Sequence, residues 1–85
     1  MIAHAMKHAY ARVTCTGCER YGKRTTILIR YLGTHKEGAV YTLYEIPLGF
    51  NVPCDECGTI GHYERNNVEL FESDSAPPAD YADMV

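Results

Sequence analysis

The sequence contains no tryptophan, no long apolar stretch and no excess of positive charge. No apolar run approaches the length that a membrane-spanning helix needs. The first eight residues lack the continuous apolar core of a secretory signal peptide, so we expect a soluble cytoplasmic protein in a reducing, intracellular compartment, where thiols remain free to bind metal. The sequence has neither a Ser/His/Asp set nor a phosphate-binding loop, and we therefore expect no enzymatic activity.

The chain length and charge limit the fold class and the kind of partner. Eighty-five residues make one small domain. Such a domain buries little apolar surface, so we expect an additional cross-link, such as a bound metal ion, to stabilise it. Its net charge of −3 is unevenly divided, because residues 1–68 carry +2 and residues 69–85 carry −5. This balance differs from that of a strongly basic nucleic-acid-binding module. Seven tyrosines and alternating Val, Ile and Thr predict a small, mostly β fold with an antiparallel sheet of three or four strands.

All four cysteines lie in two Cys-x-x-Cys pairs. They are Cys15, Cys18, Cys54 and Cys57. Each pair can present two sulfurs to one ion from a tight turn, and two pairs complete the tetrahedral shell of a structural zinc site. The spacing therefore predicts one structural Zn²⁺ held by these four thiolates. Two disulfides would suit a secreted chain, and a redox-active pair would precede a helix; the sequence favours neither, having no secretion signal and no convincing helix after either pair.

A long central hairpin is predicted between the two pairs, over about residues 25–46. Residues 25–32 are dense in β-branched and aromatic side chains and predict a central strand. Residues 33–38 predict a polar turn between two glycines, and residues 39–46 predict the returning strand. The midpoint between the two pairs is Lys36, inside this turn. Such a hairpin would bring the two pairs together at its base.

The flanking segments predict further strands. Residues 8–14 alternate in character and lead into the first pair. Phe50 and Val52 lie in an extended connection after Pro47, and we expect them to cover the core. Residues 62–71 predict another strand, broken at 66–67 by an Asn-Asn turn.

We expect three parts along the chain: an N-terminal extension at 1–8, the β domain at 9–72 and a flexible acidic tail at 73–85. The tail is rich in Ser, Asp, Ala and Pro, a composition typical of unfolded segments. It would act as a solubilising segment or present negative charge to a partner.

The two cysteine pairs, Gly58 after the second pair and the predicted hairpin resemble the zinc-ribbon superfamily over about residues 9–72. This resemblance implies a zinc-stabilised β domain. It does not define a function, since zinc ribbons serve transcription, translation, enzymes and protein assemblies alike. Two features depart from the family pattern: a 35-residue gap between the pairs, and Glu19 in place of the usual glycine after the first pair.

The second pair, Cys54-Asp-Glu-Cys57 followed by Gly58, also resembles rubredoxins, which hold iron and transfer electrons. The first pair does not resemble theirs, and the tryptophan-containing core of that family is absent. Iron is therefore the less favoured metal, and electron transfer the less favoured role.

The leading functional hypothesis is a non-enzymatic protein–protein interaction module. Free-standing zinc ribbons of this length resemble accessory or regulatory components of larger assemblies, including small proteins encoded by viruses of bacteria. Tyr31, Tyr41 and Tyr44 are the candidate anchors, because tyrosine gives a large contact area at low entropic cost.

The alternative is nucleic-acid binding by basic residues around the first pair. The candidates are Arg12, Arg20, Lys23, Arg24 and Arg30, with Tyr10 and Tyr21 available for base stacking. No small-molecule substrate and no membrane partner is expected. His62 follows Cys57 closely enough to reach the metal or its surroundings, but we assign it to the ordinary surface or core.

Overall fold

The computed structural model describes residues 6–36 and 46–85. The described elements follow one another in chain order: β1 (Met6–Thr14), α1 (Thr16–Glu19), β2 (Thr26–Lys36), β3 (Gly49–Pro53), β4 (Ile60–Glu64), the 3-10 helix η1 (Arg65–Asn67) and β5 (Glu69–Ser73). The predicted small, mostly β fold is confirmed. Within the described ranges, no helix has the length and apolar character needed to span a bilayer.

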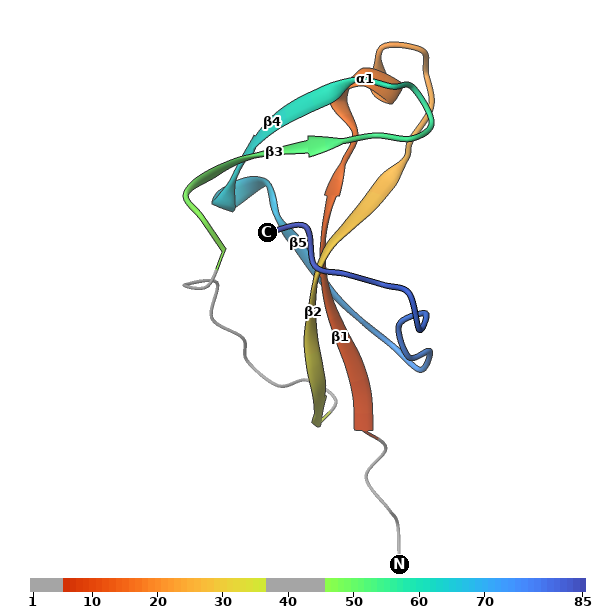
Figure 1. Ribbon diagram of the computed structural model, residues 1–85, viewed down its shortest axis with the longest axis vertical. Coiled ribbons are helices and arrows are strands. Elements are labelled where there is room, and N and C mark those ends of the chain that lie inside the picture. Colours follow the sequence, from red (N-terminus) through yellow and green to blue (C-terminus); the bar gives the residue numbers. More distant parts are fainter. Residues whose placement is uncertain (1–5, 37–45) are drawn as a thin grey trace, which may run out of the picture.

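The described strands form two antiparallel sheets (Figure 1). One has the order β2-β1-β5, with β1 in the middle, and the other pairs β3 with β4. Along β1 and β2 the register runs from Met6 opposite Lys36 to Thr14 opposite Thr26. Two shifts of register interrupt this pairing, and Gly33, with a φ of +89°, lies beside one of them. Glycine adopts this angle without strain, so β2 continues past the bulge.

The predicted strand at 25–32 is confirmed and extends further than expected. Residues 33–36 were expected to begin a turn, but they continue β2 opposite Met6–Ala9. The prediction was wrong because β1 begins two residues earlier than expected and supplies partners for these residues. The returning strand predicted at 39–46, with Tyr41 and Tyr44, lies outside the described residues except for Ile46.

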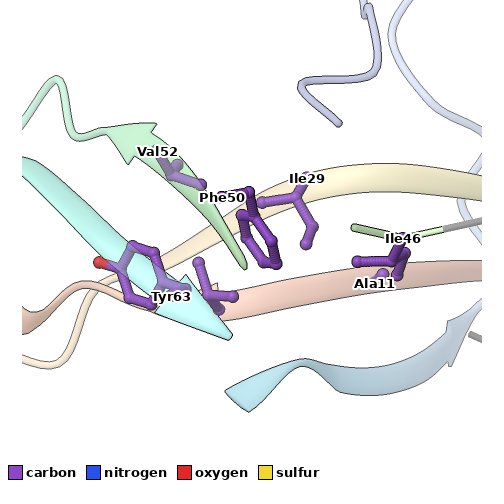
Figure 2. Close-up of a cluster of buried hydrophobic side chains, with 7 residues drawn as sticks. Ala11, Ile29, Ile46, Phe50, Val52 and Tyr63 are labelled. Carbon is purple, nitrogen blue, oxygen red and sulfur yellow. The ribbon is translucent and has the colours of Figure 1, made fainter. Parts of the chain in front are cut away.

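The hydrophobic core lies between the two sheets (Figure 2). Its buried members are Ala11, Val13, Ile29, Ile46, Phe50, Val52 and Tyr63. Residues alternate between buried and exposed along β3 and along β4, as expected for strands with one covered face. Phe50 and Val52 are 7% and 0% exposed, which confirms that they cover the core.

An aromatic cluster centres on Tyr10, which is also buried. The Tyr10 ring lies 5.3 Å from the rings of both Tyr31 and Phe71, measured between centroids. Arg12 places its guanidinium 4.2 Å from the centroid of the Phe71 ring, and its Nε donates a 2.8 Å hydrogen bond to Glu69. Aromatic pairs and a cation over a ring stabilise beyond the area they bury, so this cluster ties β5 to β1 and β2.

The break predicted at Asn66-Asn67 is confirmed, but the strands on either side do not form a hairpin. η1 turns the chain there, and the Glu64 N–H donates a 2.8 Å hydrogen bond to the Asn67 side chain. β4 then lies in one sheet and β5 in the other. The segment therefore connects the two sheets.

Residues 73–85 were expected to be unfolded, but Ser73 ends β5, and the end of this C-terminal segment bonds to β2 (Figure 1, dark blue). The Met84 N–H donates to the Ile29 carbonyl at 2.8 Å, and the Tyr31 N–H donates to the Asp83 carboxylate at 2.8 Å. Val85 packs against the core, and its carbonyl accepts a 2.9 Å bond from Arg30. These few anchors outweigh the acidic composition on which the prediction rested.

Candidate metal centre

The four cysteine sulfurs converge on one point. All four Sγ atoms lie within 4.8 Å of one another, and the closest pairs are Cys15–Cys57 at 3.6 Å and Cys18–Cys54 at 3.7 Å. None forms a disulfide. A zinc ion with four bonds of about 2.3 Å would place tetrahedral sulfurs about 3.8 Å apart. The thiols therefore fit a single tetrahedral metal ion, and the prediction that the two pairs meet is confirmed.

The first pair is shaped by the turn that follows β1. The Cys15 N–H bonds to the Thr25 carbonyl at 2.7 Å and closes the loop between β1 and β2. α1 then turns the chain so that the Cys18 N–H points at the Cys15 sulfur, 3.4 Å away. Gly22, with a φ of +73°, lets the loop return to β2. The loop and its hydrogen bonds place both sulfurs on the same side.

The second pair is built in the same way between β3 and β4. The Cys54 N–H bonds to the Thr59 carbonyl at 3.0 Å, and the Gly58 N–H bonds to the Cys54 carbonyl at 2.8 Å. Gly58 has a φ of +70°, which accounts for a glycine directly after the second pair.

The described strands place the two pairs differently from the prediction. We expected both pairs at the base of one hairpin, but each occupies the tip of its own hairpin, β1–β2 or β3–β4 (Figure 1). The two tips meet, and the four sulfurs lie between them. The midpoint argument identified the correct pairs but not the strands that carry them, because β2 pairs with β1 along its described length.

Two contacts join the hairpin tips closely. A Cβ atom on Gly17 would lie 2.8 Å from the Cys57 sulfur, so the first tip approaches the second more closely than any larger residue would allow. The Tyr63 ring lies over Gly61, and its hydroxyl accepts a 3.2 Å hydrogen bond from the Thr16 N–H at the start of α1. Tyr63 therefore links β4 to the first cysteine pair.

We expect Tyr63→Phe to lower the free energy of unfolding by about 1 kcal/mol, the typical value of a lost hydrogen bond, because the Thr16 N–H loses its acceptor while the ring stays in the core. Urea unfolding followed by circular dichroism would measure the change. Tyr21→Phe removes the same hydroxyl from a ring that is 78% exposed and should leave the midpoint unchanged. Equal stability of both variants would show that the hydroxyl contributes nothing to this link.

The surroundings of Cys57 lower the pKa of its thiol, whereas the surroundings of Cys18 raise the pKa of that thiol. Hydrogen bonds from the Thr59 N–H and hydroxyl lower the pKa of Cys57 to about 6, which favours the thiolate, the form that binds metal. A hydrogen bond with Thr25 also lowers the pKa of Cys18, but burial and the three neighbouring thiols raise it to about 12. A bound dication would relieve this crowding of like groups.

No histidine in the described part of the chain belongs to the sulfur cluster. Among the described residues, the four cysteines form the metal-ligand group without a histidine or carboxylate. His62 is exposed and its Nδ1 lies 3.0 Å from the Asn51 side-chain oxygen, and the Nε2 of His35 lies 2.7 Å from the Leu32 carbonyl. A closed shell of four sulfurs has no position open for water or a substrate.

The other described candidate residues belong partly to the sheet and partly to the loop after α1. Arg12, Arg30 and Tyr31 belong to the sheet, where Arg30 contacts the C-terminal segment and the Tyr31 hydroxyl bonds to His8 at 2.8 Å. The exposed candidates occupy the loop after α1; they are Arg20, Lys23 and Arg24, beside Tyr21. Arg30 and Tyr31 are thus engaged in contacts of the sheet, whereas the candidates of the loop are exposed.

Sequence reasoning missed the residues that support the cluster. Thr25 and Thr59 hydrogen-bond to ligand sulfurs, Gly17 allows the close approach, and Tyr63 bonds across the tips. The position of Gly17 between two ligands was the one available signal, and it indicated a turn without the contact to Cys57. Of the other three, Tyr63 acts across the gap between the hairpins, which no local pattern reveals, whereas Thr25 and Thr59 each bond to a cysteine of their own hairpin tip.

Comparison of the chain with protein-family models, with curated proteins and with solved structures gives no match. The geometry therefore stands on its own: a small β protein whose four clustered cysteines can hold a metal ion.

Proposed function

We propose that this chain is a non-catalytic, zinc-stabilised protein-binding module that serves as an accessory component of a larger assembly. The observation that carries the proposal is the convergence of four thiols from two hairpin tips on one point. Four sulfurs complete the coordination of zinc, so such a site stabilises a fold and leaves no position for chemistry. Two facing Cys-x-x-Cys turns on short hairpins also agree with a zinc ribbon.

The surface near the metal end supports a protein partner. Tyr21 and Ile60 are 78% and 69% exposed, and they lie in the loop after α1 and at the start of β4. A hollow of about 290 Å³ beside Cys57 is lined by Tyr21 together with Lys23 and Glu56, so both charge signs meet there. Exposed aromatic and apolar side chains among mixed charges are typical of protein interfaces.

Nucleic-acid binding has weaker support. Arg12 bonds to Glu69, and Arg30 bonds to Val85. Lys23, in the loop that also carries Arg20 and Arg24, lines a hollow together with Cys18, Cys57 and Glu56. A phosphate backbone approaching this loop would therefore meet negative charge as well.

Capture experiments with lysate of the source cells would test the proposal. We expect the zinc-loaded chain to retain a specific protein that survives nuclease treatment, and the chelator-stripped chain to lose it, because the binding surface depends on the metal. Recovery that disappears with nuclease would favour the nucleic-acid alternative. Recovery of no specific protein, or equal recovery with and without metal, would contradict the proposal.

A further inference from the structure

A groove runs beside the first half of β2. Three parts of the chain line it: residues 26–28 of β2 with the residue before them, residues 53–56 at the second cysteine pair, and residues 78–84 of the C-terminal segment. The groove encloses about 550 Å³, within the range of about 300–1,000 Å³ typical of ligand sites. β1 pairs with one side of β2, and the described sheet has no strand on the other.

The C-terminal segment forms one wall because it is anchored at the far end of the groove. Met84 donates its N–H to the Ile29 carbonyl, and Asp83 accepts from the Tyr31 N–H. Both β2 groups thus bond outward, away from β1, at the point where the groove ends. Within residues 6–36 and 46–85, no strand pairs with β2 on the side away from β1, so backbone groups on that side can bond to an extended chain, as Ile29 and Tyr31 already do to the C-terminal segment.

The lining residues define the chemistry of an occupant. Ile27, Leu28 and Met84 supply apolar surface, and Asp55, Glu56 and Asp80 supply negative charge, whereas no Lys or Arg from the described ranges lines the groove. An occupant that complements this lining carries a positive charge beside apolar side chains.

Tyr81 supplies an aromatic wall at this site. Its ring lines the groove, while its hydroxyl oxygen is buried beside the Asp83 carboxylate. An occupant of the groove would therefore meet the ring of Tyr81 together with the apolar side chains.

Resting on the proposed protein-binding function, we propose that this groove binds an extended segment of a partner protein, with a basic residue among apolar ones, as an added strand beside β2. The peptide backbone pairs with the edge of β2, its basic side chain faces Asp80 and the second cysteine pair, and its apolar side chains cover Ile27. Strand addition gives affinity through the main chain and specificity through alternate side chains. In this proposal the acidic C-terminal segment forms one wall of the peptide-binding site.

The test uses the full zinc-loaded chain and a fluorescent peptide in which every second residue is valine and the residues between are lysine or threonine. In the control peptide, glutamate replaces each lysine. We expect the lysine peptide to bind, to shift the amide resonances of residues 26–28, and to bind about tenfold more tightly than its glutamate counterpart. Asp80→Lys should weaken binding by about tenfold. Asp74→Lys makes the same change of charge in the same segment outside the groove, and it should have a smaller effect.

A second pair of variants tests the wall. Met84→Pro removes the N–H that anchors the segment and should abolish peptide binding, whereas Met84→Ala keeps this N–H, loses only the apolar side chain at the groove and should weaken binding less. Equal binding of the lysine and glutamate peptides, equal effects of Asp80→Lys and Asp74→Lys, or unmoved resonances at 26–28 would each overturn the groove proposal. If the Asp80→Lys variant captures a partner protein as well as the wild type does, the proposed protein-binding function is supported and the groove proposal fails. If the peptide binds as expected but no partner is captured, only the proposed function fails.

Discussion

Replacing Cys18 with serine is expected to abolish the folded state. Cys18 is 2% exposed, and its sulfur contacts Cys54 from the opposite hairpin tip, so its loss breaks the link between the sheets as well as the metal shell. Among the described residues the main core comprises seven buried side chains, and a chain of only 85 residues buries too little apolar surface to be very stable without a further link. Structural zinc contributes about 10–16 kcal/mol to folding in small domains, comparable with or larger than the whole stability of most proteins, about 5–15 kcal/mol.

Circular dichroism of the variant and of the wild type treated with chelator would measure this effect, and we expect both to lose the β spectrum. His62→Ala is the matched control, because His62 follows the second pair but bonds to Asn51 outside the sulfur cluster. It should retain one equivalent of metal and the wild-type spectrum. A Cys18→Ser protein that unfolds at the wild-type urea midpoint would refute a structural role for the metal.

The same preparation identifies the metal. Elemental analysis is expected to give one zinc per chain, without the visible absorption that iron in four thiolates produces. A red protein with one iron would instead favour the electron-transfer alternative, since a tetrahedral site of four sulfurs suits either ion.

The ligands could be predicted from the sequence, but the strands that carry them could not. Cys-x-x-Cys spacing reflects local geometry, because two sulfurs reach one ion from a single turn whatever the strands do. Pairing of strands is a non-local choice. The segment 8–14 has modest β character, yet β1 became the centre of its sheet because it pairs with both β2 and β5.

The C-terminal segment shows a second limit of sequence reasoning. Composition predicts disorder when a segment has too few apolar residues to offset chain entropy. In this segment Val85 packs against the core and Tyr81 is half-buried, while three hydrogen bonds tie residues 83–85 to β2. A few long-range anchors of this kind do not change an average composition, so the sequence gives no sign of them.

Gly17→Ala is expected to weaken metal binding without changing a ligand. The added Cβ would lie 2.8 Å from the Cys57 sulfur and 3.1 Å from the Cβ of Thr59. Neither neighbour can move away without cost, because the Cys57 sulfur is a metal ligand and Thr59 hydrogen-bonds to that sulfur. Overpacking of this kind costs about 1–3 kcal/mol, and here the simplest relief moves the hairpin tips apart. Zinc affinity should therefore fall by roughly 5- to 150-fold.

Competition with a chelating dye at neutral pH would measure the affinity, and Gly22→Asn is the control. Gly22 lies in the same loop with a φ of +73°, but a Cβ there meets nothing within 4 Å. Asparagine tolerates this backbone conformation, so the control should keep the wild-type affinity. If Gly17→Ala also binds zinc as the wild type does, the tips must separate without disturbing the sulfurs. The four ligands would then be positioned by their own loops alone, and the contact between hairpins would serve stability rather than metal binding.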